Sequence, residues 1–134
     1  MILPHGTIVA VADGTTLKLY RNRGKEPEID LIEFDHPKIT PTNPGAGSRH
    51  RSNSFNPDSH RKAEDSFAAA SASQLNRLAL DGSLEQLFVI ADPRTLGEMR
   101  KHFHATLQAK ILGEVPKELI DHSIHEIGIA IRHA

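Results

Sequence analysis

The sequence contains no cysteine, no tryptophan and only one tyrosine among its 134 residues. The absence of cysteine excludes disulfide bonds, thiolate nucleophiles and cysteine metal sites, and it is compatible with a reducing cytosol. Aromatic residues make up only 4% of the chain, so side chains that could stack on nucleic-acid bases are scarce. Chemistry in this protein must therefore come from charged, histidine and hydroxyl side chains.

Long hydrophobic runs and a strong excess of one charge are also missing. No apolar run approaches membrane-spanning length, and the first six residues lack the basic region and apolar run of a secretory signal. We therefore expect no membrane insertion and a soluble, cytoplasmic protein. The formal net charge of -1 gives the whole molecule no electrostatic footprint for nucleic acid or acidic lipid. Any such binding must come from a local patch.

The chain is long enough for one hydrophobic core and too short for two ordinary domains, so we predict a single domain over residues 1–134. Its composition changes at residues 36–58, which are rich in proline, glycine, serine and asparagine and have almost no large apolar side chain. This stretch predicts a long flexible loop.

Before the loop, the sequence predicts three strands. Thr7–Ala12 is apolar and rich in β-formers, and the Asp13-Gly14 pair that follows is a strong turn signal. Thr16–Arg21 is closer to strict alternation, and Ile29–Phe34 alternates apolar with acidic residues. Three strands joined by short turns indicate an antiparallel meander.

After the loop, Asp58 or Ser59 can cap a long helix that ends at Leu80. The small residues of Ser66–Ser73 would let this helix approach the sheet or another helix closely, which would also suit a homodimer. Its predicted buried stripe has the spacing of one helix face: Ala63, Phe67, Ser71, Leu75 and Leu78.

The second half begins with Leu87–Ala91, a continuously apolar run that suits a strand covered on both faces. Asp92 can cap the next helix, and Pro93 suits its first position, where no N–H is needed. That helix is amphipathic through Leu96, Met99 and Phe103.

A further strand, Ala109–Val115, contains Gly113 and is followed by Pro116, which argues for an edge strand or a bulge. Ser123 starts a last helix whose predicted inward residues are Ile124, Ile127, Ala130 and Ile131. The element order predicts an α/β fold with a mixed five-stranded sheet, a three-strand antiparallel meander plus two parallel strands, and about three helices. We expect the ribonuclease-H-like architecture, with the first and fourth strands as neighbours.

Three ordered segments carry a resemblance to a known family. IADPRTLGEMR at 90–100, ILGEVPKEL at 111–119 and HSIHEI at 122–127 resemble the bacterial "protein required for attachment to host cells" family. The hairpin at 11–14 and the helix segment at 61–68 are similar to it as well, so the resemblance covers nearly the whole chain. The family usually has Lys-Asp-Leu where this chain has Lys-Glu-Leu at 117–119.

The resemblance implies kinship with the middle domain of archaeal and eukaryotic peptide-chain release factors, a ribonuclease-H-like fold, and RNA or the ribosome as partner. Release factors act in peptidyl-tRNA hydrolysis through a Gly-Gly-Gln loop, whereas the long loop here holds Gly45-Ala46-Gly47. The resemblance therefore extends to fold and partner class and not to that chemistry. It also implies an effect on attachment to host cells, indirect for an intracellular protein; an envelope-associated attachment component is the alternative.

The best polar cluster is basic and suits phosphate, because arginine forks match phosphate geometry and a flexible loop can order on RNA. Its residues lie in the loop and at the start of the long helix: Arg49, His50, Arg51, His60, Arg61 and Lys62. Arg94, Arg100 and Lys101 could join them. The alternative is a solvated loop beside an ordinary charged helix face.

A second hypothesis is enzymatic. Asp13 and Asp92 each end one of two neighbouring strands, and Glu64 or Asp65 could approach from the long helix. Carboxylates placed like that hold two divalent metals for phosphodiester cleavage. We favour structural roles for both aspartates, Asp13 in a tight turn and Asp92 as a helix cap.

A third hypothesis is a metal site at His122 and His125, whose spacing puts both imidazoles on one helix face and could ligate zinc. No third ligand follows from the sequence, so we favour capping and surface roles. We predict no cofactor. The sequence as a whole predicts a non-catalytic binding module that contacts RNA or the ribosome through residues 45–62.

Overall fold

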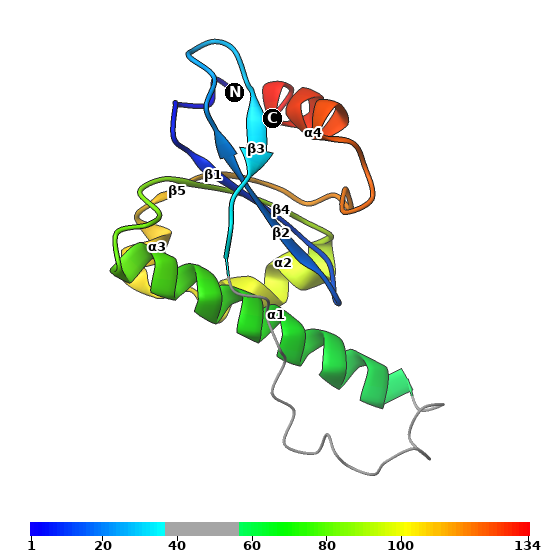
Figure 1. The fold of residues 1–134 in the computed structure, drawn as a ribbon. Coiled ribbons are helices and arrows are strands. Elements are labelled where there is room, and N and C mark those ends of the chain that lie inside the picture. The colour runs from blue at the N-terminus through cyan, green and yellow to red at the C-terminus, as the bar shows by residue number, and fades with distance from the viewer. Residues whose placement is uncertain (37–56) are drawn as a thin grey trace.

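The computed structural model describes residues 1–36 and 57–134, and the predicted loop at 36–58 lies almost wholly outside these residues. The described chain forms one five-stranded sheet with helices on both faces (Figure 1). The strands are β1 Ile8–Ala12, β2 Leu17–Asn22, β3 Leu31–Glu33, β4 Leu87–Ala91 and β5 Ile111–Val115. The helices are α1 Pro57–Leu80, α2 Pro93–Arg100, α3 Ala105–Gln108 and α4 Ile124–Arg132.

The strand order β3-β2-β1-β4-β5 confirms the predicted mixed sheet. Strands β1, β2 and β3 form the antiparallel meander, while β4 runs parallel to both β1 and β5. Strand β5 lies at the edge and carries an irregularity, because Leu87 pairs with Ile111 whereas Phe88 pairs with Gly113. Both features follow the prediction from Gly113 and Pro116. The ribonuclease-H-like class remains a prediction.

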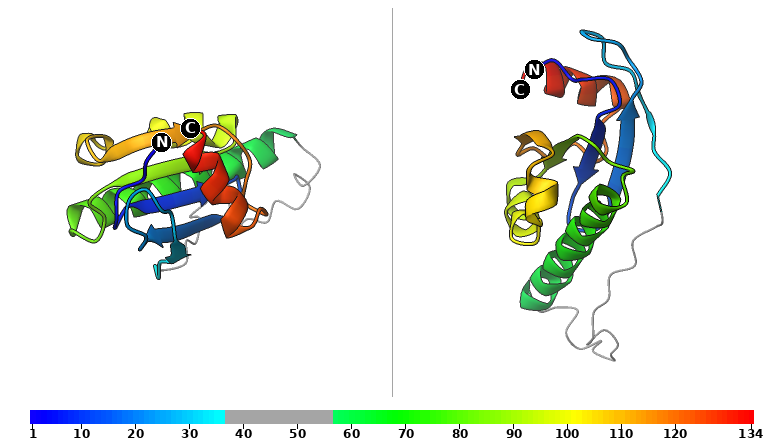
Figure 2. Two further views of the ribbon diagram at one scale, coloured as in Figure 1. Left: turned by 90° about the horizontal axis from the view of Figure 1, so that it is seen from above. Right: turned by 90° about the vertical axis from the view of Figure 1, so that its left-hand side faces the viewer.

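The two central strands carry a hydrophobic core on each face. Every residue of β1 and β4 is buried, and neighbouring residues point to opposite faces. Ile8, Ala10 and Ala12 belong to the core beneath α1, α2 and α3, whereas Val9 and Val11 belong to the core beneath α4. Two-sided cover explains why both strands are continuously apolar. Figure 2 shows α4 on one side of the sheet and the other helices on the opposite side.

Helix α1 is longer than the part of it that packs on the sheet. It begins at Pro57, slightly before the predicted start, since proline suits the first helical turn. Its first buried side chain is Phe67, and Ala63 is exposed, so the predicted stripe was wrong at that end. The physical reason is visible in Figure 1, where the first turns of α1 project beyond the sheet.

The predicted helix through Phe103 was also wrong, because α2 ends at Arg100 and the short helix α3 follows. The side chain of Asn76 in α1 stabilises the break between α2 and α3. Its side-chain amide donates to His102 O at 2.9 Å and its oxygen accepts from His104 N at 2.9 Å. These bonds fix a non-helical connection in which Phe103 is still buried.

Three smaller differences concern the ends of elements. The third strand covers only Leu31–Glu33, although Phe34 N still donates to Leu19 O at 2.9 Å. Ile124 in the first turn of α4 is 43% exposed, so it does not face the core as predicted. Strand β5 begins at Ile111, two residues later than predicted. Within the described ranges, no helix is long and apolar enough to span a bilayer.

Candidate functional site

The basic residues that the structure describes lie on the projecting start of α1. His60, Arg61 and Lys62 are exposed, and none of their side chains makes a hydrogen bond or ion pair with another described residue. Arg49, His50 and Arg51, the loop half of the predicted cluster, lie outside the described residues. The candidate site is therefore defined by the first turns of α1, which we call the basic turn (residues 60–62).

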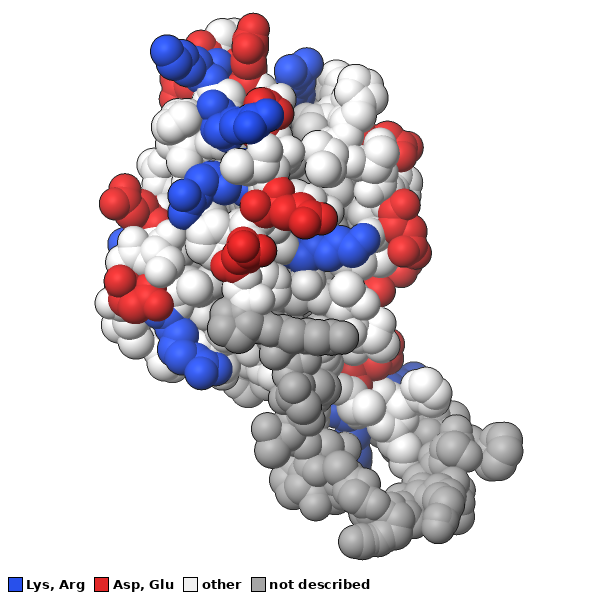
Figure 3. Space-filling model, viewed as in Figure 1, with Lys and Arg blue, Asp and Glu red and all other residues white. Residues whose placement is uncertain are grey.

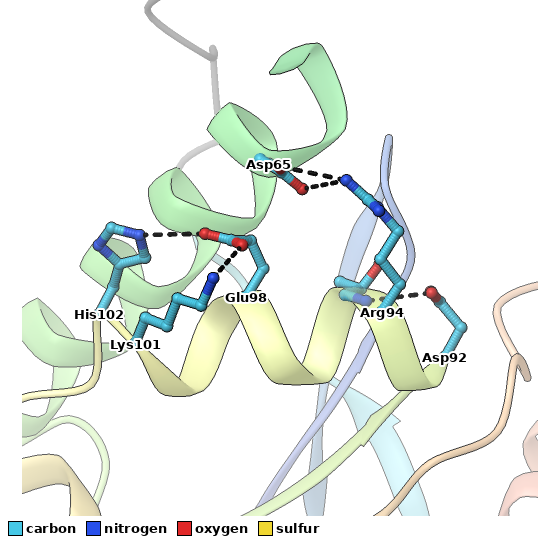
Figure 4. A network of polar contacts seen from close by, with 7 residues as sticks. Asp65, Asp92, Arg94, Glu98, Lys101 and His102 are labelled. Carbon is cyan, nitrogen blue, oxygen red and sulfur yellow. Dashed lines mark hydrogen bonds and ion pairs between the residues drawn. The ribbon is translucent and has the colours of Figure 1, made fainter. Parts of the chain in front are cut away.

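The two carboxylates that follow the basic turn in α1 lie toward the body of the protein. Asp65, one helical turn after Arg61, accepts from Nη2 of Arg94 at 3.0 and 3.2 Å (Figure 4). Glu64 lies against Gly14, where an added Cβ would come within 2.5 Å of Glu64 Oε2. Residues three and four apart on a helix are the natural ion-pair partners of Arg61. Asp65 is paired with Arg94 and Glu64 lies beside Gly14, so neither carboxylate compensates the charge of the basic turn in the described structure.

The three other basic residues that could join the cluster each have a carboxylate partner in the described structure. Arg94 pairs with Asp65, Arg100 Nη2 lies 2.5 Å from Glu114 Oε1, and Lys101 Nζ lies 2.9 Å from Glu98 Oε1. On the face shown in Figure 3, basic and acidic side chains alternate without a large area of one sign.

Two of these pairs shift the pKa of their members. The hydrogen bond and charge of Glu114 raise the pKa of Arg100 above its ordinary value. The Lys101 ammonium lowers the pKa of Glu98, with a smaller contribution from His102, whose Nε2 lies 3.6 Å from Glu98 Oε2. The Arg100–Glu114 pair joins α2 to β5, and the contacts of Glu98 (Figure 4) join α2 to the residues that follow it.

The candidate catalytic carboxylates have the structural roles that the sequence favoured. Asp13 Oδ1 accepts from the backbone N–H groups of Thr15 and Thr16, at 2.8 and 2.7 Å. Asp92 is the N-cap of α2, and its Oδ2 accepts from Thr95 N at 3.1 Å. The two aspartates each follow the last residue of a strand, Ala12 of β1 and Ala91 of β4, and these two residues are paired.

Although Asp13 and Asp92 follow neighbouring strands, they do not form a metal site in the described part of the chain. Asp13, Asp92 and Glu64 do not form a cluster that could hold a metal ion, and residues 1–36 and 57–134 contain no such group of three ligands. The geometry therefore gives no support to metal-dependent cleavage at these three carboxylates.

The histidine pair near α4 does not converge on one point. His122 Nδ1 lies 3.5 Å from Glu126 Oε2, whereas His125 is exposed beside Ile29 and Gly128. Glu126 also closes a capping box with Ser123, the residue predicted to start this helix. Among the described residues, neither histidine belongs to a group of three potential metal ligands.

The two contacts that shape the candidate site could not be predicted from the sequence. Arg94 and Asp65 are 29 residues apart and come from different helices. Glu64 meets Gly14 only because α1 crosses the end of β1. Neither pair has a characteristic spacing, and both arise from the docking of α1 on the sheet and α2.

Comparison with known proteins identifies the family. No curated protein matches the sequence. The sequence model of bacterial archaeo-eukaryotic release factor family 12 matches residues 6–131, which is nearly the whole chain. This match supports the release-factor part of the resemblance, while its host-attachment part stays a prediction. The chain belongs to bacterial archaeo-eukaryotic release factor family 12.

Proposed function

We propose that the protein is a non-catalytic, translation-associated module that binds RNA of the ribosome through the basic turn of α1. The observation that carries this proposal is the exposure of Arg61 and Lys62 without a counter-charge in the described structure. Membership of a release factor family supports the ribosome as partner. Arg49, His50 and Arg51, which lie outside the described residues, are proposed as further contacts.

The geometry suits backbone recognition rather than base recognition. An arginine fork can bind phosphate oxygens in pairs, and a lysine adds a point charge. The scarcity of aromatic residues removes the usual stacking platform, so phosphate contacts must supply most of the affinity. The mixed sheet with helices on both faces also supports the ribonuclease-H-like relationship to release-factor middle domains. An effect on attachment to host cells would be indirect under this proposal.

The proposal is tested by co-sedimentation of the purified protein with ribosomes and separated subunits at low and raised salt. We expect salt-sensitive co-sedimentation of the unaltered protein. The double variant Arg61→Ala, Lys62→Ala should bind more weakly, and the slope of log affinity against log salt should fall by roughly 1.5 to 2, since about two phosphate contacts are lost. Its thermal stability should be nearly unchanged, because both side chains are exposed.

A matched control removes two positive charges elsewhere. Lys25 and Arg77 are exposed and have no ion-pair partner among the described residues, so Lys25→Ala, Arg77→Ala changes the net charge equally. This variant should bind ribosomes like the unaltered protein. Equal weakening by both double variants would show a general charge effect and reject the basic turn as the site. Absence of the unaltered protein from every ribosomal fraction would reject the proposed partner.

A further inference from the structure

Most of the large apolar side chains exposed in the described structure lie together around α4. Ile124 and Ile129 of α4 are 43% and 41% exposed, and Met1 and Ile2 beside it are 37% and 59% exposed. The only other large apolar side chain with comparable exposure in the described ranges is Leu80, at the end of α1. An exposed apolar cluster of this kind marks an interaction surface more often than a scattered set does.

This surface is hollowed. A groove of about 260 Å³ runs between α4 and the chain at 29–31, and Ile124, Gly128, Ile129 and Arg132 line its helical side. Arg132 also borders a second hollow beside Met1 and Ile2, so the two hollows adjoin at this residue. We call the whole surface the α4 groove.

Gly128 has no conformational role that requires glycine, because it lies inside a regular helix and does not have a positive φ. Glycine at such a position costs about 1 kcal/mol relative to alanine. A Cβ there would meet nothing in this chain closer than Ile29 Cγ2 at 3.9 Å. The missing side chain leaves the helix backbone open at the centre of the groove, where a second helix could approach closely.

The charges of α4 are complementary to those of an antiparallel copy. Its beginning carries the carboxylates of Asp121 and Glu126 beside His122 and His125, whereas its end carries the Arg132 guanidinium beside His133. Asp121 and Arg132 are exposed and have no ion-pair partner in the described part of the chain. Antiparallel packing would place the basic end of one helix beside the acidic end of the other, in the arrangement that helix dipoles also favour.

We infer that the α4 groove is the contact surface of a homodimer in which two α4 helices pack antiparallel about a two-fold axis. The surface is self-complementary, as an isologous contact requires: apolar and open at its centre, and opposite in charge at its ends. The exposed face of α1, with its small residues, lacks this combination and offers only Leu80 as a large apolar contact. This dimer does not depend on the proposed RNA contact, which lies on another helix.

Sedimentation equilibrium of the full chain over a range of concentrations tests the inference. The unaltered protein should have the mass of two chains at the higher concentrations. Ile129→Glu should shift it to one chain while its melting temperature in dilute solution stays nearly unchanged, because the side chain is exposed. Leu80→Glu introduces the same charge on α1 and should leave the dimer intact.

Charge reversal gives a second, independent test. Arg132→Glu should raise the dissociation constant of the dimer by about tenfold or more, since like charges would face each other. Asp121→Arg in the same chain should restore dimerisation, because each end then meets the opposite charge again. A monomeric unaltered protein, dissociation by Leu80→Glu but not by Ile129→Glu, or failure of the reversed pair to recover would overturn the inference.

Discussion

At the scale of single residues, Asn22 organises the end of the sheet from which β1 begins. Its side chain is fully buried, and its amide nitrogen donates to Leu3 O and Pro4 O at 3.1 and 3.2 Å. Its oxygen accepts from Gly24 N and Asp30 N at 3.0 and 2.9 Å. One side chain thus bonds to backbone groups from two separate connections. Pro4 O also accepts from Thr7, whereas Leu3 O, Gly24 N and Asp30 N depend on Asn22.

Asn22→Ala should lower the free energy of unfolding by about 2 to 4 kcal/mol, because it leaves several buried backbone groups unpaired. Urea denaturation of the variant and the unaltered protein measures this difference. A loss below 1 kcal/mol would mean that water replaces the side chain.

Ser71 provides the matched control for removal of a buried polar group. Its hydroxyl oxygen is buried in the core and has no hydrogen-bond partner among the residues that the structure describes. Ser71→Ala removes an unsatisfied polar atom and places a better helix former in α1. We expect unchanged or slightly higher stability, so the two substitutions should differ in sign as well as size.

At the scale of elements, the capping box of α4 couples the start of this helix to pH. Ser123 N and Oγ lie 3.1 and 3.2 Å from Glu126 Oε1, and Glu126 N donates back to Ser123 Oγ at 3.1 Å. These bonds to Ser123 lower the pKa of Glu126, and His122 contributes less. A folded-state pKa below the unfolded value means that the stabilisation is complete above the ordinary glutamate value of about 4.3. It is lost as the pH falls through the folded-state pKa.

Ser123→Ala removes the hydroxyl donor but keeps the backbone N–H, so it should move the pKa of Glu126 only part of the way back toward that of an unstructured peptide. Loss of the Oγ acceptor of Glu126 N should also fray the first turn of α4. An NMR titration of the Glu126 side-chain carboxyl measures both states. The pKa of Glu98 is held down by Lys101 rather than by Ser123, so it should stay the same in the variant. If the pKa of Glu126 in the unaltered protein were already the ordinary glutamate value, the capping box would not form in solution.

The elements that the sequence predicted well are those whose signal is local. The continuous apolar runs of β1 and β4, the Asp92-Pro93 start of α2 and the Ser123 start of α4 need only neighbouring residues to be recognised. The break between α2 and α3 was missed because Asn76, 26 residues before His102, decides it. Periodicity found the buried face of α1 but not where the sheet beneath it ends, which is why Ala63 was misplaced.

In the candidate site, too, the local property was predictable from the sequence and the long-range one was not. Exposure of Arg61 and Lys62 was predictable from the helix pattern, because no large apolar residue lies near them in the first turns. Whether their charge is compensated was not predictable, since that depends on Asp65 facing Arg94 across two helices. Sequence spacing alone would have favoured pairing of Asp65 with Arg61.

At the scale of the whole molecule, the pairing of Asp65 with Arg94 rather than with Arg61 links the packing of α2 to the proposed RNA contact. Arg94→Ala would release Asp65, which could then pair with Arg61 one turn earlier on the same helix. The Arg94–Asp65 pair is half exposed, so its loss should change the free energy of unfolding by less than about 1 kcal/mol. Ribosome binding should weaken because Asp65 would compensate the charge of Arg61.

The double variant Arg94→Ala, Asp65→Ala separates compensation from a direct contact by Arg94. It lacks the released carboxylate, so ribosome binding should return to that of the unaltered protein in the same sedimentation assay. Binding that stays weak in the double variant would assign Arg94 itself to the RNA contact.

The projection of α1 beyond the sheet has a consequence for its dynamics. Backbone amides in the turns before Glu64 are held only by the helix itself, so they should exchange with solvent through local fraying. Those after Phe67 should exchange only when the core opens. A partner bound at the basic turn would then slow hydrogen exchange in one short segment and leave the most protected amides unchanged. Hydrogen exchange at the start of α1 would then measure how much of the basic turn is bound, and exchange at its end would measure the global stability of the protein.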